Sequence, residues 1–157
     1  NLPEGELFTA PAELNGHMVV DELGDWFGDK YGCLTKPESN SDAPVHIDVV
    51  SSRVDLKTLE CHNAKMKLEL IDYLKTDKNS DRAGEFALPT NIELLTKPLI
   101  GKLLQDEKAR VHIAFGDPYP DLTGADWHSK THVDGLMKKC DVWVDGKRIM
   151  EADKYLI

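Results

Sequence analysis

Short segments rich in valine and isoleucine, separated by turn residues, recur along the chain and restrict it to a strand-rich fold. Apolar residues alternate with polar ones over 45–49, as expected for a strand with one buried face. Near the end of the chain, Asp145-Gly146 separates two apolar runs, which predicts a type I′ hairpin. The segment 63–76 repeats apolar residues at helical spacing and predicts a helix. We therefore expect an α+β fold, a strand-rich mixed sheet with one or two helices in a single domain.

The rest of the chain predicts shorter strands and two long connections. A second helix over 92–104 would be broken near Pro98. The segments 29–44 and 117–130 are polar and contain proline, so we expect loops there; the second is long enough to suggest a functional role. Further strands are expected at 17–21, 45–54, 85–88, 110–115, 142–144 and 148–150, with irregular chain or a short edge strand over 1–15.

The length and charge of the chain exclude several classes of protein. Its 157 residues suit one domain with a self-sufficient core. Nineteen Lys and Arg against 28 Asp and Glu give a net charge of -9, the wrong sign for binding nucleic acid or an anionic membrane. No apolar run is long enough to span a membrane and no signal peptide is evident, so we expect a soluble, cytoplasmic protein. The three widely spaced cysteines favour free thiols, and the start at Asn1 suggests an excised domain.

The motif His132-Val133-Asp134 places an imidazole and a carboxylate two residues apart. On an extended chain both side chains lie on one face, so they could bind one metal ion. His112 lies within an apolar strand, where a core histidine bonded to a backbone carbonyl is the simpler interpretation of that residue alone. Together with the His-x-Asp pair, His112 favours a metal site with nitrogen and oxygen ligands.

Three glutamates, Glu6, Glu85 and Glu107, have apolar or glycine neighbours. Each alone is most simply a surface residue. A calcium loop beginning at Asp77 is excluded because Arg82 stands where such a loop needs glycine. We interpret 77–81 as a turn that caps the preceding helix.

Five segments of the chain, taken in order, carry a family resemblance. They are NLPEGELFTAP (1–11), GEFALPTN (84–91), DEKARVHIAFGDPYP (106–120), HVDGLM (132–137) and DVWVDGKRIM (141–150). Together they resemble the C-terminal, catalytic half of metallo-aminopeptidases of the aminopeptidase T and aminopeptidase S family. The resemblance implies that 1–157 is this catalytic domain without the family's N-terminal α/β domain. It also implies that the full-length protein is a homodimer.

The resemblance further implies a role for each candidate residue. Glu107 and Tyr119 match the two residues regarded as catalytic. Two Zn²⁺, Co²⁺ or Mn²⁺ ions would activate a water, Glu107 would move its proton, and Tyr119 would bond the oxyanion. This chemistry would remove N-terminal residues from peptide substrates. The implied metal ligands are Glu6, Glu85, His112, His132 and Asp134, with Glu85 expected to bridge the ions.

Two other functions fit the same residues. His112, His132 and Asp134 form the two-histidine, one-carboxylate set of a mononuclear Fe(II) dioxygenase resembling dihydroxypyridine dioxygenase. The glutamates favour the dinuclear hydrolase, because a mononuclear iron site would not need all three. The second alternative is a non-catalytic metal-binding or dimerisation fragment. Pro89 replaces the family's usual glycine, which leaves the nearby loop geometry open.

Overall fold

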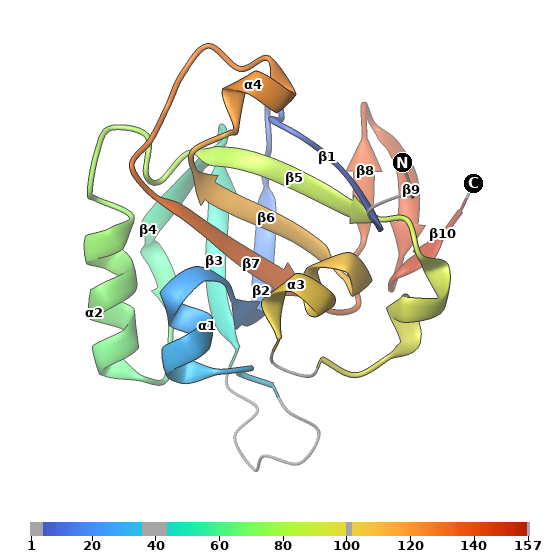
Figure 1. Cartoon of the computed structure of the whole chain (residues 1–157), viewed down its shortest axis with the longest axis horizontal. Helices are drawn as coiled ribbons and strands as arrows, with labels where there is room; N and C mark the ends of the chain where they lie inside the picture. Colours follow the sequence, from blue (N-terminus) through green and yellow to red (C-terminus); the bar gives the residue numbers. More distant parts are fainter. Residues whose placement is uncertain (1–4, 36–43, 100–101, 157) are drawn as a thin grey trace.

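Seven strands form the main sheet of the computed structural model, which describes residues 5–35, 44–99 and 102–156. They are β1 (Glu6–Thr9), β2 (Gly16–Leu23), β3 (Val45–Val50), β4 (Arg53–Glu60), β5 (Ala83–Pro89), β6 (Val111–Gly116) and β7 (His132–Met137). Their order across the sheet is β1-β5-β6-β7-β2-β3-β4 (Figure 1), and the pairings are antiparallel. The strand-rich α+β class expected from the sequence is confirmed. The parts of the expected segments at 1–4, 36–43, 100–101 and 157 lie outside the described residues.

The segment 45–54, expected to be strand, forms two strands joined by a tight turn. Ser51 and Ser52 adopt φ angles of 49° and 62°, the left-handed values that a type I′ hairpin requires. Serine is uncommon at such positions, so the sequence carried no turn signal there. The predicted hairpin at Asp145-Gly146 is present, with φ angles of 48° and 77°.

The helices are short, and two of them, α1 (Asp25–Tyr31) and α4 (Pro120–Thr123), were not expected. Asn63 caps α2 (Ala64–Tyr73), as its side-chain oxygen accepts from the backbone N–H of Met66 at 3.0 Å. The last three residues of α1 lie in the segment 29–44, where a loop was expected. The predicted broken helix is present as a 3₁₀ turn η1 (Ile92–Thr96), then α3 (Leu103–Asp106) after Pro98; the remaining turns are η2 (Glu107–Ala109) and α4 (Pro120–Thr123). Within the described residues, no helix is long and apolar enough to cross a membrane.

One face of the main sheet is apolar and forms the core. The sheet also curls, because the N–H of Ala83 on β5 donates to the carbonyl of Ser52, beside β4, at 2.8 Å. The start of β4, at one edge of the sheet, therefore approaches the start of β5, the strand next to the other edge. The apolar cluster includes, from the strands and α2, Met18, Val20, Ile113, Val133, Met66 and Leu70.

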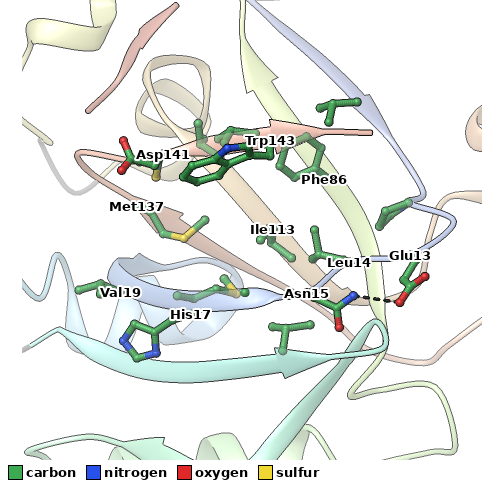
Figure 2. Close-up of a pocket in the computed structure, with 18 of the residues that line it drawn as sticks. Glu13, Leu14, Asn15, His17, Val19, Phe86, Ile113, Met137, Asp141 and Trp143 are labelled. Carbon is green, nitrogen blue, oxygen red and sulfur yellow. Dashed lines mark hydrogen bonds between the residues drawn. The ribbon is translucent and has the colours of Figure 1, made fainter. Parts of the chain in front are cut away.

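A smaller sheet of β8 (Val142–Val144), β9 (Lys147–Glu151) and β10 (Lys154–Tyr155) lies on the side of the molecule away from α2 (Figure 1). Between it and the main sheet is a cavity of about 700 Å³ (Figure 2). Phe86, Ile113 and Trp143 line it. Because successive strand residues point to opposite faces, the neighbours of Phe86 and Ile113 belong to the other face of the sheet. Those neighbours are the predicted ligands Glu85 and His112.

Candidate metal centre

The polar face of the sheet brings the predicted ligands together from four adjacent strands. In the strand register, Ala114 lies opposite both Glu85 and Asp134, and Ala87 lies opposite His112. Both alanines are fully buried, so small side chains leave space among the polar ones. Glu6 lies on β1, Glu85 on β5, His112 on β6, and His132 and Asp134 on β7.

Gly84 explains how Glu85 reaches this face. The pairing of β5 with β6 shifts between Ala83 and Glu85, which leaves Gly84 as the bulge residue. A Cβ atom on Gly84 would lie 2.3 Å from the carbonyl oxygen of Gly116. The two strands approach too closely there for any residue with a side chain.

Backbone carbonyls orient both histidines. The Nδ1 atom of His132 lies 2.8 Å from the carbonyl oxygen of Asp117, and that of His112 lies 3.3 Å from the carbonyl oxygen of Arg110. A carbonyl can only accept, so each Nδ1 carries a proton and each Nε2 faces the carboxylates. Metal-binding histidines usually have this arrangement, with the second ring nitrogen donating to a carbonyl or carboxylate.

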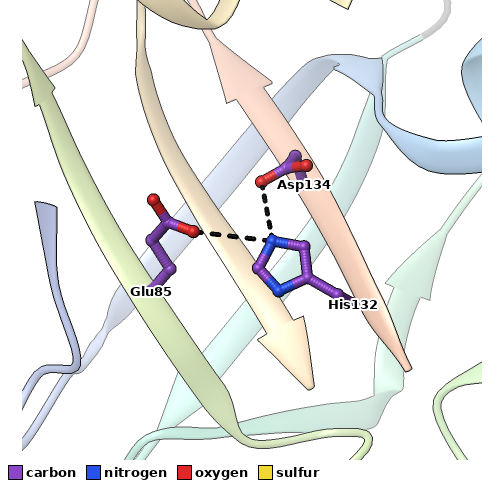
Figure 3. A group of neighbouring side chains, drawn as sticks. All are labelled: Glu85, His132 and Asp134. Carbon is purple, nitrogen blue, oxygen red and sulfur yellow. Dashed lines mark ion pairs between the residues drawn. The ribbon is translucent and has the colours of Figure 1, made fainter. Parts of the chain in front are cut away.

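The two Nε2 atoms face carboxylate oxygens at distances longer than ordinary hydrogen bonds. His132 Nε2 lies 3.5 Å from Glu85 Oε2 and 3.5 Å from Asp134 Oδ1 (Figure 3). His112 Nε2 lies 3.7 Å from Glu6 Oε2 and 3.8 Å from Glu85 Oε1. Two atoms that each lie about 2 Å from a tetrahedral ion are about 3.3 Å apart, so these gaps are close to the size an ion needs. Ligand atoms of Glu85, His132 and Asp134 all lie within 4.8 Å of one another.

The charge distribution in this cluster stabilises a cation. Burial alone would lower the pKa of His112, but Glu85, Asp134 and Glu6 outweigh it and raise the pKa to about 9. Burial raises the pKa of Glu6, and the nearby Glu85 adds to the effect. Among the described residues, Oε2 of Glu6 is buried without a hydrogen-bond partner. A buried carboxylate oxygen of this kind fits a site whose missing partner is a metal ion.

The two residues predicted to be catalytic lie beside the ligands. Glu107, in η2, has its pKa raised to about 7 by burial and by the charges of Glu6 and Asp134. Burial and the charge of Asp134 raise the pKa of Tyr119 to about 12. The ring of Tyr119 lies 4.5 Å from that of His132 between centroids.

Tyr119 has an unusual backbone conformation for a bulky residue. Its φ of 51° and ψ of 65° lie in the left-handed region. Pro120 follows it, and a proline disfavours the right-handed helical region for the residue before it. Asp117 accepts a hydrogen bond from the N–H of Tyr119 at 3.2 Å and so supports this turn. Strained positions of this kind are common at functional sites.

Sequence reasoning missed the residues that fix the loop 117–131. Asp77 accepts from the N–H of Lys130 at 2.7 Å and from the Ser129 hydroxyl at 3.1 Å. The expected turn at 77–81 is present, and its aspartate anchors the loop that carries Tyr119 and leads into His132. Asp117 was also missed, although its place after Gly116 at the end of an apolar strand could have drawn attention to it. Asp77 had no such signal, because the contact spans 53 residues of sequence.

A cavity of about 500 Å³ opens beside this cluster. Tyr119, His132 and Asp134 line it, with Tyr73 and residues of the loop 117–131. Its volume falls within the range of small-molecule sites. The predicted ligands thus have access to a space that could hold part of a substrate.

Two solved structures share this fold. Wild-type AmpT, an aminopeptidase T from Thermus thermophilus, is 22% identical, with a TM-score of 0.65, and the match covers 98% of this chain and 40% of AmpT. The structure of 2,5-dihydroxypyridine dioxygenase from Pseudomonas putida KT2440 is 17% identical, with a TM-score of 0.62, and the match covers 98% of this chain and 44% of that chain. No protein-family profile matches the chain, and no curated protein sequence matches it.

At these identities the comparisons establish an aminopeptidase-like fold for the chain, which spans less than half of either neighbour. The resemblance found in the sequence is confirmed to that extent. The structure brings all seven predicted site residues into one cluster. Their individual roles stay predictions.

Proposed function

We propose that this chain is a metal-dependent aminopeptidase domain that hydrolyses N-terminal residues from peptides with two divalent ions, Zn²⁺, Co²⁺ or Mn²⁺. The observation that carries the proposal is Glu85, which has one carboxylate oxygen towards His112 and the other towards His132. A carboxylate in that position is suited to bridge two ions. Glu6 would complete the half-site of His112, and Asp134 that of His132.

The other residues of the cluster have properties that suit hydrolysis. Two bound ions lower the pKa of a water and polarise a carbonyl. Glu107 would accept the proton of that water and deliver it to the leaving amine. Tyr119 would donate a hydrogen bond to the oxyanion through its phenol hydroxyl. The carboxylates would also attract the α-ammonium group of a peptide.

The proposal includes the organisation of a longer protein. The chain covers 40% of AmpT, so residues 1–157 would correspond to one domain of such an enzyme. A peptide substrate, a homodimeric full-length protein and a cytoplasmic location are parts of the same proposal. The cavity beside the cluster would receive the N-terminal residue of the peptide.

A mononuclear Fe(II) dioxygenase is the second candidate function. The fold shared with 2,5-dihydroxypyridine dioxygenase favours it, as does the set of His112, His132 and Asp134. Such a site would leave Glu6 and Glu85 without a role. The hydrolase uses both glutamates, and we prefer it for that reason.

The test is a reconstitution assay on the purified chain. The protein is stripped with a chelator, reloaded separately with Zn²⁺, Co²⁺, Mn²⁺ or Fe²⁺, and assayed with aminoacyl p-nitroanilides. We expect release of p-nitroaniline with at least one of the first three ions. Oxygen consumption with a dihydroxypyridine and Fe²⁺ would instead favour the dioxygenase. Metal binding without either activity would support the non-catalytic fragment.

A further inference from the structure

A second group of metal-binding side chains lies on the half of the sheet formed by β2, β3 and β4. His17 on β2 has its Nδ1 atom 2.7 Å from Oδ1 of Asp48 on β3. The Nε2 atom of the same ring lies 3.2 Å from Nδ1 of His46, also on β3. None of these residues belongs to the cluster of Glu85, His132 and Asp134. We propose that His17 and His46 bind one borderline divalent ion, of which Zn²⁺ is the probe used below, with Asp48 as the support of His17.

The hydrogen bond to Asp48 determines which nitrogen of His17 is available. An ionised carboxylate can only accept, so the proton of a neutral His17 ring lies on Nδ1. Nε2 then presents a lone pair towards Nδ1 of His46. A histidine that donates its other N–H to a carboxylate is a common arrangement in metal sites, and the contact raises the basicity of the ligand nitrogen.

The separation of the two ring nitrogens fits a shared ion. Two nitrogens at 2.0–2.1 Å from a tetrahedral zinc are about 3.3 Å apart. His17 Nε2 and His46 Nδ1 lie 3.2 Å apart, and the two ring planes meet at 30°. The strand register produces this approach, because His17 lies opposite Asp48, and His46 lies opposite Val19 two residues further along β2. The histidines are thus diagonal neighbours on one face.

The surroundings are acidic and open to solvent. The side chain of His17 is 56% exposed and that of Asp48 is 41% exposed, so water can complete the coordination of an ion. Glu60 lies opposite His46 and Asp55 opposite Asp48 on β4, which places two further carboxylates on this face. Imidazole ligands suit Zn²⁺, Co²⁺, Ni²⁺ or Cu²⁺ and do not suit Ca²⁺ or Mg²⁺. An ion there would link β2 to β3.

Calorimetric titration of the chelator-stripped chain with Zn²⁺ tests the proposal. We expect the wild-type chain to bind one equivalent more than His17→Ala or His46→Ala. His62→Ala, which removes an exposed histidine outside the pair, should bind as the wild type does. Asp48→Asn should keep the site and weaken it by about 10- to 100-fold. Circular dichroism checks that each variant is folded.

A second measurement locates the ion without any substitution. Long-range ¹H–¹⁵N spectra report the imidazole nitrogens directly, and zinc should shift Nε2 of His17 and Nδ1 of His46. Equal stoichiometry in the wild type and both alanine variants would overturn the proposal, as would unchanged spectra of both rings at saturating zinc. Because His17 and His46 have no part in the aminopeptidase proposal, these outcomes do not depend on its success.

Discussion

The same sheet carries two groups of histidines and carboxylates, and they differ in how the imidazoles are held. Among β1, β5, β6 and β7, backbone carbonyls hold Nδ1 of His112 and His132, and burial is nearly complete, with the His112 side chain 3% exposed. On β2 and β3, a carboxylate holds His17, whose side chain is 56% exposed. Carboxylates in the first group have few waters to solvate them, whereas those in the second are hydrated. The buried group therefore needs a cation more strongly.

This difference predicts where substitutions have large effects. In the buried group each ligand compensates charges that solvent reaches poorly, so removing one disturbs the rest. In the exposed group, water replaces whatever is removed. Residues that only position the buried group should have intermediate effects.

The largest effect is expected for His132→Ala. The substitution removes one nitrogen ligand between Glu85 and Asp134, and we expect loss of tight metal binding. Metal content after gel filtration is the measurement. His128→Ala is the matched control, because His128 lies on the loop that leads into His132 and its side chain is 78% exposed. Equal metal content in the two variants would contradict the ligand assignment.

Glu107→Gln should separate catalysis from metal binding. It removes the proposed base and keeps its shape, so we expect normal metal content and a loss of turnover of roughly 10²-fold or more. The measurement is kcat with an aminoacyl p-nitroanilide after metal loading. The exposed Glu13→Gln serves as the control. If the Glu107 variant lost metal instead, Glu107 would be a ligand.

Gly84→Ala tests the bulge that directs Glu85 to the buried group. The new Cβ would lie 2.3 Å from the carbonyl oxygen of Gly116. We expect the free energy of unfolding to fall by roughly 1–3 kcal/mol and metal affinity to fall with it. Urea denaturation measures the first effect. Gly16→Ala is the control, since nothing lies within 4 Å of the Cβ position there. Equal stability in both variants would show that β5 and β6 can separate at no cost.

Asp77→Asn should have the smallest effect and a defined pH dependence. Hydrogen bonds from the N–H groups of Lys130 and Asn79 lower the pKa of Asp77 from 3.8 to about 2. A lowered folded-state pKa means that this carboxylate stabilises the fold above pH 4 and loses that contribution as the pH falls towards 2. We expect the variant to be less stable by about 1 kcal/mol at pH 7.

The difference should become smaller at pH 3. Urea denaturation of both proteins between pH 3 and pH 7 measures it, with the exposed Asp72→Asn as the control. A difference that stays constant down to pH 3 would refute the role of the charge. Retained stability at pH 7 would show that Asp77 does not anchor the loop.

Local sequence patterns predicted the elements whose signals are local. The alternation over 45–49, the Asp145-Gly146 turn and the His132-Val133-Asp134 spacing all depend on neighbouring residues, and the structure contains all three. Local patterns did not predict the Ser51-Ser52 turn or α1, because the residues there have a low propensity for those structures. The family resemblance singled out the seven predicted site residues, which local patterns alone left mostly as surface or core residues.

The strand order could not be predicted from local patterns. β7 lies between β6 and β2, a pairing of segments more than 100 residues apart in sequence, and nothing in either segment specifies it. The anchoring of the loop 117–131 by Asp77 likewise depends on the folded chain. The resemblance to a known family therefore carried information that spacing and propensity did not.

Elemental analysis of the purified chain, before any chelation, tests the central claim most directly. The account predicts about two Zn²⁺, Co²⁺ or Mn²⁺ ions per chain for the buried group, measured in His17→Ala so that the exposed pair does not contribute. One iron per chain would contradict the two-metal hydrolase and favour the dioxygenase. A chain that binds no metal, even after soaking, would show that Glu85, His112 and His132 do not form a metal centre.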